Sequence, residues 1–134
     1  MGLVALPGTE DLANKVNYYL LKWRDEPENG YNLLSAKPGY HRETFVIDSA
    51  CPRFGNGEGK GLLRESVRGY DLYLLCDVGN YGETYQMFGM DYPMSPDDHY
   101  QNIKRIIAGK ENKISFKSSA VIMKEMPKGD TNQK

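Results

Sequence analysis

The run from Tyr70 to Cys76 limits the possible folds more than any other part of the sequence. It reads Tyr-Asp-Leu-Tyr-Leu-Leu-Cys, and apolar residues at consecutive positions indicate a strand that is buried on both faces. Such strands are typical of parallel sheets covered by helices. A second apolar run, Leu3 to Leu6, ends at Pro7 and Gly8 and leads into a helical pattern. Because a strand followed directly by a helix is the repeating unit of α/β proteins, we expect an α/β fold.

Two stretches carry apolar residues at helical spacing. The first follows Thr9, whose hydroxyl is expected to cap a helix of about four turns. Its expected buried face consists of Leu12, Ala13, Val16, Tyr19, Leu20 and Trp23. The second follows Ser95, with Asp98 at the capping-box position and Gly109 at the expected end. Its expected buried face consists of Tyr100, Ile103, Ile106 and Ile107.

The remaining segments complete the order β-α-β-hairpin-β-α-β. They are strands at 44–48 and 120–123, a glycine-rich loop or irregular hairpin at 51–61, and long connections at 25–40 and 78–94. The sequence therefore predicts one three-layer α/β/α domain over residues 1–123, with a mostly parallel sheet and a hairpin. Residues 124–134 show no periodicity and are expected to form a disordered tail.

Charge and cysteine content exclude several classes of protein. Lys and Arg number 17 against 18 Asp and Glu, and this balance argues against a nucleic-acid-binding protein or one held at anionic membranes. The two cysteines, Cys51 and Cys76, are too few for a disulfide framework, and Cys76 is expected to be a buried thiol. The first residues do not resemble a signal peptide and no run is long enough to span a membrane. We therefore expect a cytoplasmic protein.

The segment from Phe54 to Glu58 is the first candidate site. It places an aromatic ring, the Asn56 amide and the Glu58 carboxylate on a glycine-rich loop. Such a loop can stack a planar base on Phe54 and hydrogen-bond its edge through the two polar side chains. The alternative is a hairpin tip whose polar residues only face water. The glycines do not form a phosphate loop, because no Gly-Lys-Ser/Thr follows them.

Two further segments have a structural and a functional interpretation. Asp97, Asp98 and His99 could bind a metal ion, but carboxylates are also favoured in the first turn of any helix. We expect the structural role and no metal site. The Met- and Tyr-rich segment 81–94 is expected to pack over a core or an interface rather than to bind a cofactor.

Taken together, these segments resemble ribose-phosphate pyrophosphokinases over roughly residues 3–123, apart from an insertion at 25–40. The most specific similarity is Glu65-Ser66-Val67-Arg68-Gly69-Tyr70-Asp71, which resembles the family's Glu-Ser-Val-Arg-Gly-x-Asp segment. Phe54-Gly55-Asn56-Gly57-Glu58 resembles the family's Phe-x-Asp-Gly-Glu loop. The Leu-Pro-Gly-Thr turn at 6–9 and the helix start at 95–99 are similar to segments at the same places in the family.

The resemblance implies a phosphoribosyltransferase-like fold and a place in nucleotide biosynthesis. The family transfers a diphosphoryl group from ATP to ribose 5-phosphate with Mg²⁺, and its subunits form homo-oligomers. By resemblance, Phe54 would stack on adenine, and Asn56 and Glu58 would hydrogen-bond it. Asn56 stands where the family has Asp, and Gly59 and Gly61 are expected to loosen the loop.

The family's catalytic segments have no counterpart in this sequence. Neither its Arg-Gln-x-Arg loop nor its Asp-Asp-x-x-x-Thr-Gly-Gly-Thr segment is present, so we assign no catalytic residue. We expect the amino-terminal half of such a kinase, inactive as this chain. The alternatives are a non-catalytic relative that acts as an oligomerisation or regulatory binding module, and an unrelated α/β binding domain.

Overall fold

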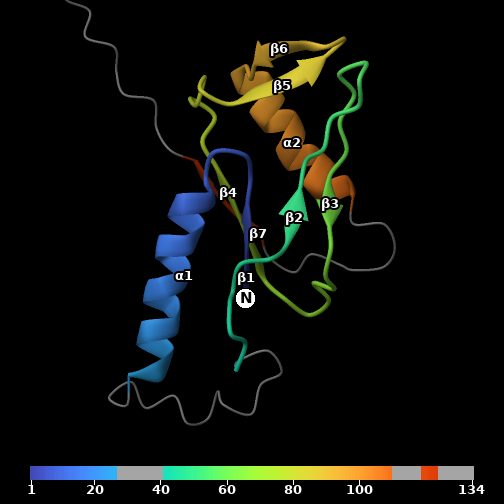
Figure 1. Cartoon of the computed structure of the whole chain (residues 1–134). Coiled ribbons are helices and arrows are strands. Elements are labelled where there is room, and N and C mark those ends of the chain that lie inside the picture. The colour runs from blue at the N-terminus through green and yellow to red at the C-terminus, as the bar shows by residue number, and fades with distance from the viewer. Residues whose placement is uncertain (27–40, 110–118, 124–134) are drawn as a thin grey trace, which may run out of the picture.

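The computed structural model describes residues 1–26, 41–109 and 119–123, and Figure 1 shows their arrangement. The elements in chain order are β1 (Gly2–Ala5), α1 (Glu10–Asp25), β2 (Ser49–Ala50), β3 (Leu62–Leu63), β4 (Leu72–Cys76), β5 (Thr84–Met87), β6 (Met90–Pro93), α2 (Pro96–Ala108) and β7 (Ser119–Met123). The connection expected at 25–40, apart from its first two residues, and the tail expected at 124–134 lie outside the described residues.

A parallel sheet with the strand order β1-β4-β7 lies at the centre. Leu3 pairs with Tyr73, and Tyr73 pairs in turn with Ala120. Residues 45–47 run along the other side of β1, where the Leu3 N–H donates to Phe45 O and the Ile47 N–H donates to Leu3 O, both at 2.7 Å. The strand expected at 44–48 is thus a short extended segment with a single bridge, at Val46.

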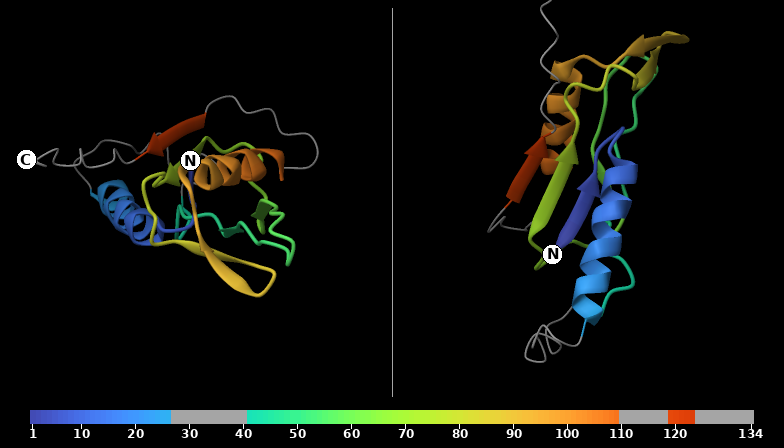
Figure 2. Two further views of the ribbon diagram at one scale, coloured as in Figure 1. Left: turned by 90° about the horizontal axis from the view of Figure 1, so that it is seen from above. Right: turned by 90° about the vertical axis from the view of Figure 1, so that its left-hand side faces the viewer.

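The two helices lie on opposite sides of this sheet, as the two views of Figure 2 show. Side chains alternate between the two faces of a strand. Val4, Leu72, Leu74 and Cys76 accordingly share one core cluster with Ile103 and Ile106 of α2. The adjacent positions Leu3 and Leu75 are also buried. The expected α/β class, with a parallel sheet and both faces of β4 buried, is confirmed.

Helix α1 begins where expected, but Thr9 does not cap it in the expected way. The Thr9 hydroxyl makes no capping bond. It donates instead to Leu6 O at 2.7 Å and to Leu75 O at 3.0 Å, so it connects the end of β1 to β4. The prediction that its oxygen would accept from the helix was wrong, because the hydroxyl is directed at these two backbone carbonyls.

The expected buried face of α1 was also only partly right. Ala13 is buried, but Leu12, Tyr19 and Trp23 are 45%, 51% and 54% exposed. A helix of 16 residues is about 24 Å long, whereas a strand of four residues spans about 13 Å. Figure 1 shows α1 extending beyond the end of β1, so the short sheet covers only part of the apolar stripe.

Helix α2 has the predicted ends. Ser95 and Asp98 form a reciprocal capping box, Pro96 stands at the first position and Gly109 follows the last residue. The buried face is rotated from the one predicted and consists of His99, Asn102, Ile103 and Ile106. Tyr100 and Ile107 are each 43% exposed. Apolar spacing missed this face because two of its buried residues are polar.

The connection expected at 78–94 contains an antiparallel hairpin, β5–β6, which the sequence analysis missed. Met87 pairs with Met90 across a two-residue turn formed by Phe88 and Gly89. The sequence signal was Gly89 between two runs rich in Tyr and Met, but an aromatic residue before the glycine is not a usual turn signal. This hairpin lies next to the candidate site.

Candidate functional site

The segment 51–61 forms an irregular hairpin, as one of the two predicted alternatives. β2 and β3 pair antiparallel below it, and an isolated bridge joins Arg53 to Gly59. At the tip, the Gly57 N–H donates to Phe54 O at 2.8 Å, and Gly57 adopts a φ of 87°. This turn leaves the Phe54 side chain 52% exposed.

Asn56 and Glu58 are both exposed at the same tip. The Asn56 Oδ1 accepts from the Glu58 N–H at 3.0 Å, and the Phe54 N–H donates to Glu58 O at 2.6 Å. The amide oxygen of Asn56 therefore stabilises the turn. Its Nδ2 makes no hydrogen bond within the described residues. A carboxylate, a side-chain amide and a phenyl ring are thus presented together on an ordered turn.

Arg53 holds this tip in place and was missed in the sequence. Its guanidinium carbon lies 4.4 Å from the centre of the Tyr85 ring. Its Nη1 donates to Gly57 O at 3.0 Å, and its Nη2 pairs with Asp98 Oδ1 at 3.1 Å. Its side chain is only 8% exposed. Arg53 therefore links the tip to β5 and to α2, and its charge is already paired.

The turn of the β5–β6 hairpin also contacts the tip, and Figure 1 shows the two at the same end of the molecule. The Phe88 N–H donates to Gly55 O at 2.8 Å. A Cβ atom on Gly57 would lie 2.6 Å from the sulfur of Met87, so the Met87 side chain packs directly against this glycine. Phe88 and Met90 remain 74% and 58% exposed, which gives this end an apolar surface beside the polar tip.

The residues in the first turn of α2 make structural contacts: Ser95 and Asp98 form the capping box, and Asp98 also pairs with Arg53. His99 is buried, and its Nε2 lies 2.9 Å from Asn80 O. Partial burial would raise the pKa of Asp98, but hydrogen bonds from the Ser95 N–H and hydroxyl and from Arg53 outweigh it and hold the pKa below the ordinary value. Within residues 1–26, 41–109 and 119–123, no group of three or more His, Cys, Asp or Glu is placed to hold a metal ion.

Gly61 lies close against the end of α2. A Cβ on Gly61 would lie 2.2 Å from Arg105 O, and one on Gly109 would lie 2.2 Å from Gly61 O. These glycines let the backbone of the loop pack directly against the end of α2. A side chain at Gly61 or Gly109 would overlap backbone atoms of the other segment.

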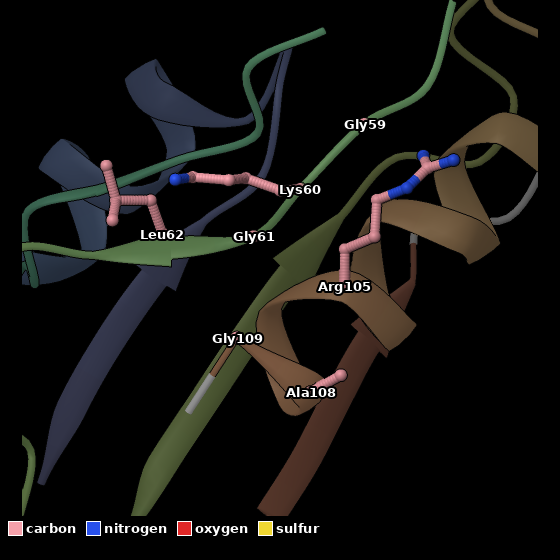
Figure 3. Close-up of a pocket in the computed structure, with 7 residues that line it drawn as sticks. All are labelled: Gly59, Lys60, Gly61, Leu62, Arg105, Ala108 and Gly109. Carbon is pink, nitrogen blue, oxygen red and sulfur yellow. The ribbon is translucent and has the colours of Figure 1, made fainter. Parts of the chain in front are cut away.

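A surface pocket of about 480 Å³ lies beside this contact. It is lined by Gly59, Lys60, Gly61, Leu62, Arg105, Ala108 and Gly109. Figure 3 shows the side chains of Lys60 and Arg105 pointing in different directions, and Arg105 Nη1 donates to Asn102 Oδ1 at 2.9 Å. The two cations therefore do not converge on one anion.

The segment from Glu65 to Asp71, which carries the closest family resemblance, has a structural role here. The Glu65 carboxylate accepts from Arg42 and, at 3.2 Å, from the Asp48 N–H. Val67 is buried in the core, and Gly69 has a φ of 80° in the turn before β4. The neighbouring Arg64 pairs with Asp48 at 3.3 Å.

Comparisons with known proteins identify no relative. No protein-family model matches the chain, and neither a curated protein nor a solved structure matches it. Of the helices in the described ranges, none has the length and apolar character needed to cross a membrane.

Proposed function

We propose that this chain is the amino-terminal domain of a ribose-phosphate pyrophosphokinase-like protein, with a phosphoribosyltransferase-like fold, and that its 54–58 loop binds the adenine ring of a nucleotide. One observation carries the proposal. Phe54 is half exposed at the tip of a loop that Arg53 fixes through three contacts. A large aromatic side chain held outward beside two polar groups is suited to stacking a planar base.

The polar groups on either side of Phe54 match the edge of adenine. The Glu58 carboxylate accepts hydrogen bonds and suits the exocyclic amino group. The Asn56 Nδ2 donates and suits a ring nitrogen, because the Asn56 oxygen already accepts from the loop backbone. A stacked base and one or two hydrogen bonds supply a few kcal/mol, which corresponds to a Kd of about 1 mM.

The phosphates of the nucleotide have few favourable contacts at this site. Diphosphoryl transfer from Mg²⁺-ATP needs several cations around the transferred group, whereas Arg53 is buried and paired with Asp98. The role proposed for these residues is therefore to hold the base. AMP and ATP are expected to bind with nearly equal affinity.

An NMR titration of isotope-labelled protein tests this proposal. AMP and ATP should both shift the amide signals of residues 53–60 with similar Kd values, and ribose 5-phosphate should not. Phe54→Ala should abolish the shifts, whereas Tyr18→Ala, which removes another exposed aromatic ring from α1 on the other side of the sheet, should not. The proposal is wrong if several millimolar AMP leaves these signals unchanged. ATP binding far tighter than AMP binding would reveal a phosphate site elsewhere.

A specific observation also favours a second function, assembly through contact with a second copy of this chain. Tyr81, Phe88 and Met90 are 58%, 74% and 58% exposed on or beside one hairpin, and contiguous apolar patches are often covered by a partner. Sedimentation at micromolar concentrations should then show a homodimer or a larger species. A monomer at every concentration would exclude this second function.

A further inference from the structure

Phe88 has a backbone conformation that its side chain disfavours. It is the first residue of the turn between β5 and β6, with a φ of 51°, and Gly89 follows with a φ of 78°. Two successive positive φ values are typical of a hairpin turn that prefers Asn, Asp or Gly at the first position. Among the described residues, Phe88 is the only non-glycine residue with a positive φ.

The packing of the described residues gives no reason to keep a phenyl ring at this strained position. Phe88 is 74% exposed, which is the largest value among the large apolar side chains of the described residues. Burial therefore contributes little to offset the strain. Residues with such backbone strain cluster at active sites, ligand-binding positions and switch regions.

The backbone of Phe88 contacts the 54–58 loop. Its N–H donates to Gly55 O at 2.8 Å, and Gly55 is the neighbour of Phe54 in the chain. In strand β5, Met87 packs against Gly57 and Tyr85 lies under the Arg53 guanidinium. The hairpin turn and the loop are thus held together at three adjacent points, and both present an exposed phenyl group.

We propose that Phe88 is a second base-stacking residue, which contacts the adenine of the nucleotide together with Phe54. This inference rests on the proposed function of the 54–58 loop. A phenyl ring has no hydrogen-bonding group, so Phe88 adds affinity for any planar base, while Asn56 and Glu58 select adenine. The strain in the turn is then the cost of holding a ring where a glycine or asparagine would be more stable.

The proposal predicts opposite effects on stability and on binding. Phe88→Asn suits the turn better, so Tm should rise by about 3 °C. The same change should weaken AMP binding at least about fivefold, because base–aromatic stacking is lost. Phe88→Gly should weaken binding to the same degree without introducing a new amide. Met90→Ser, on the same hairpin and also exposed, should leave the AMP Kd within about twofold of wild type.

NMR titration with AMP, thermal unfolding and sedimentation of these three variants give distinct outcomes. If AMP binding depends on Phe54 but is unchanged in both Phe88 variants, this proposal is overturned and the proposed function stands. If the wild type binds no AMP, both are overturned. If Phe88→Asn and Met90→Ser weaken binding equally and convert a dimer to a monomer, Phe88 contacts a second copy of the chain and the stacking role is wrong.

Discussion

The Arg53 guanidinium pairs with the Asp98 carboxylate at 3.1 Å, across 45 residues of sequence, and so joins the base of the candidate loop to the first turn of α2. Asp98 also accepts from the Ser95 N–H at 3.0 Å and from the Ser95 hydroxyl at 2.9 Å. The same carboxylate thus caps a helix and positions the loop. Any change that protonates or removes the Asp98 carboxylate should therefore affect both the start of α2 and the position of the loop.

The first prediction concerns the pH dependence of stability through Asp98. Its pKa in the folded protein is lower than the ordinary value of 3.8, so the unfolded state binds the proton more readily. The carboxylate therefore stabilises the fold above pH 3.8, and this contribution is lost as the pH falls through the lowered pKa. Urea unfolding at a series of pH values should show that acid lowers the free energy of unfolding less for Asp98→Asn than for wild type.

Asp97→Asn serves as the control for this prediction, because Asp97 lies in the same helical turn but is exposed. It should keep the wild-type dependence on pH between 5 and about 2. An acid dependence that is identical in wild type and Asp98→Asn would contradict the assigned role of Asp98.

The second prediction concerns the close packing of Gly61. Because a Cβ at this position would overlap the Arg105 backbone, Gly61→Ala should lower the free energy of unfolding by about 2 kcal/mol. Gly55→Ala is the matched control, since a Cβ there meets no atom within 4 Å, and it should change stability by less than about 0.5 kcal/mol. Urea unfolding measures both, and equal effects would show that Gly61 is not packed against α2.

The third prediction compares two ion pairs that differ in burial. In the pair between Arg42 and Glu65, the side chains are 16% and 34% exposed, against 57% and 58% for Arg64 and Asp48. Glu65→Gln should therefore cost about 1–2 kcal/mol, whereas Asp48→Asn should cost no more than about 0.5 kcal/mol. Chemical denaturation of the two variants tests this order, and the reverse order would contradict it.

The fourth prediction concerns the two thiols. Burial raises the pKa of Cys51 and of Cys76 to about 11, and only a thiolate reacts readily. At pH 7.5 a thiol-specific reagent should therefore label the folded protein slowly, and two thiols should react rapidly in guanidinium chloride. Rapid labelling of the folded protein at pH 7.5 would contradict the raised pKa values of the two thiols.

The sequence predicted the elements that depend on local patterns and missed those that depend on distant contacts. The βα unit, strand β4 and the capping box at Ser95 were identified because each has a signal within a few residues. The buried face of α2 was not, because the partner of His99 Nε2 is Asn80 O, which belongs to another segment. Periodicity counts apolar residues and cannot identify a buried polar residue whose partner is distant.

The residues of the candidate site also divide into those with a local sequence signal and those that depend on distant contacts. Phe54, Asn56 and Glu58 lie within five residues, so the sequence alone suggested them as a candidate site. Arg53 was missed because its partners, Tyr85 and Asp98, lie more than 30 residues away. Phe88 was missed because its positive φ can be recognised only from the structure of the hairpin turn.

The most direct test of the account is an intermolecular NOE measurement between AMP and the protein. The adenine H2 and H8 protons should show NOEs to the ring protons of Phe54, and Phe54→Ala should remove them while the protein stays folded. NOEs from adenine to other residues, with none to Phe54, would contradict the central claim that this loop binds the base.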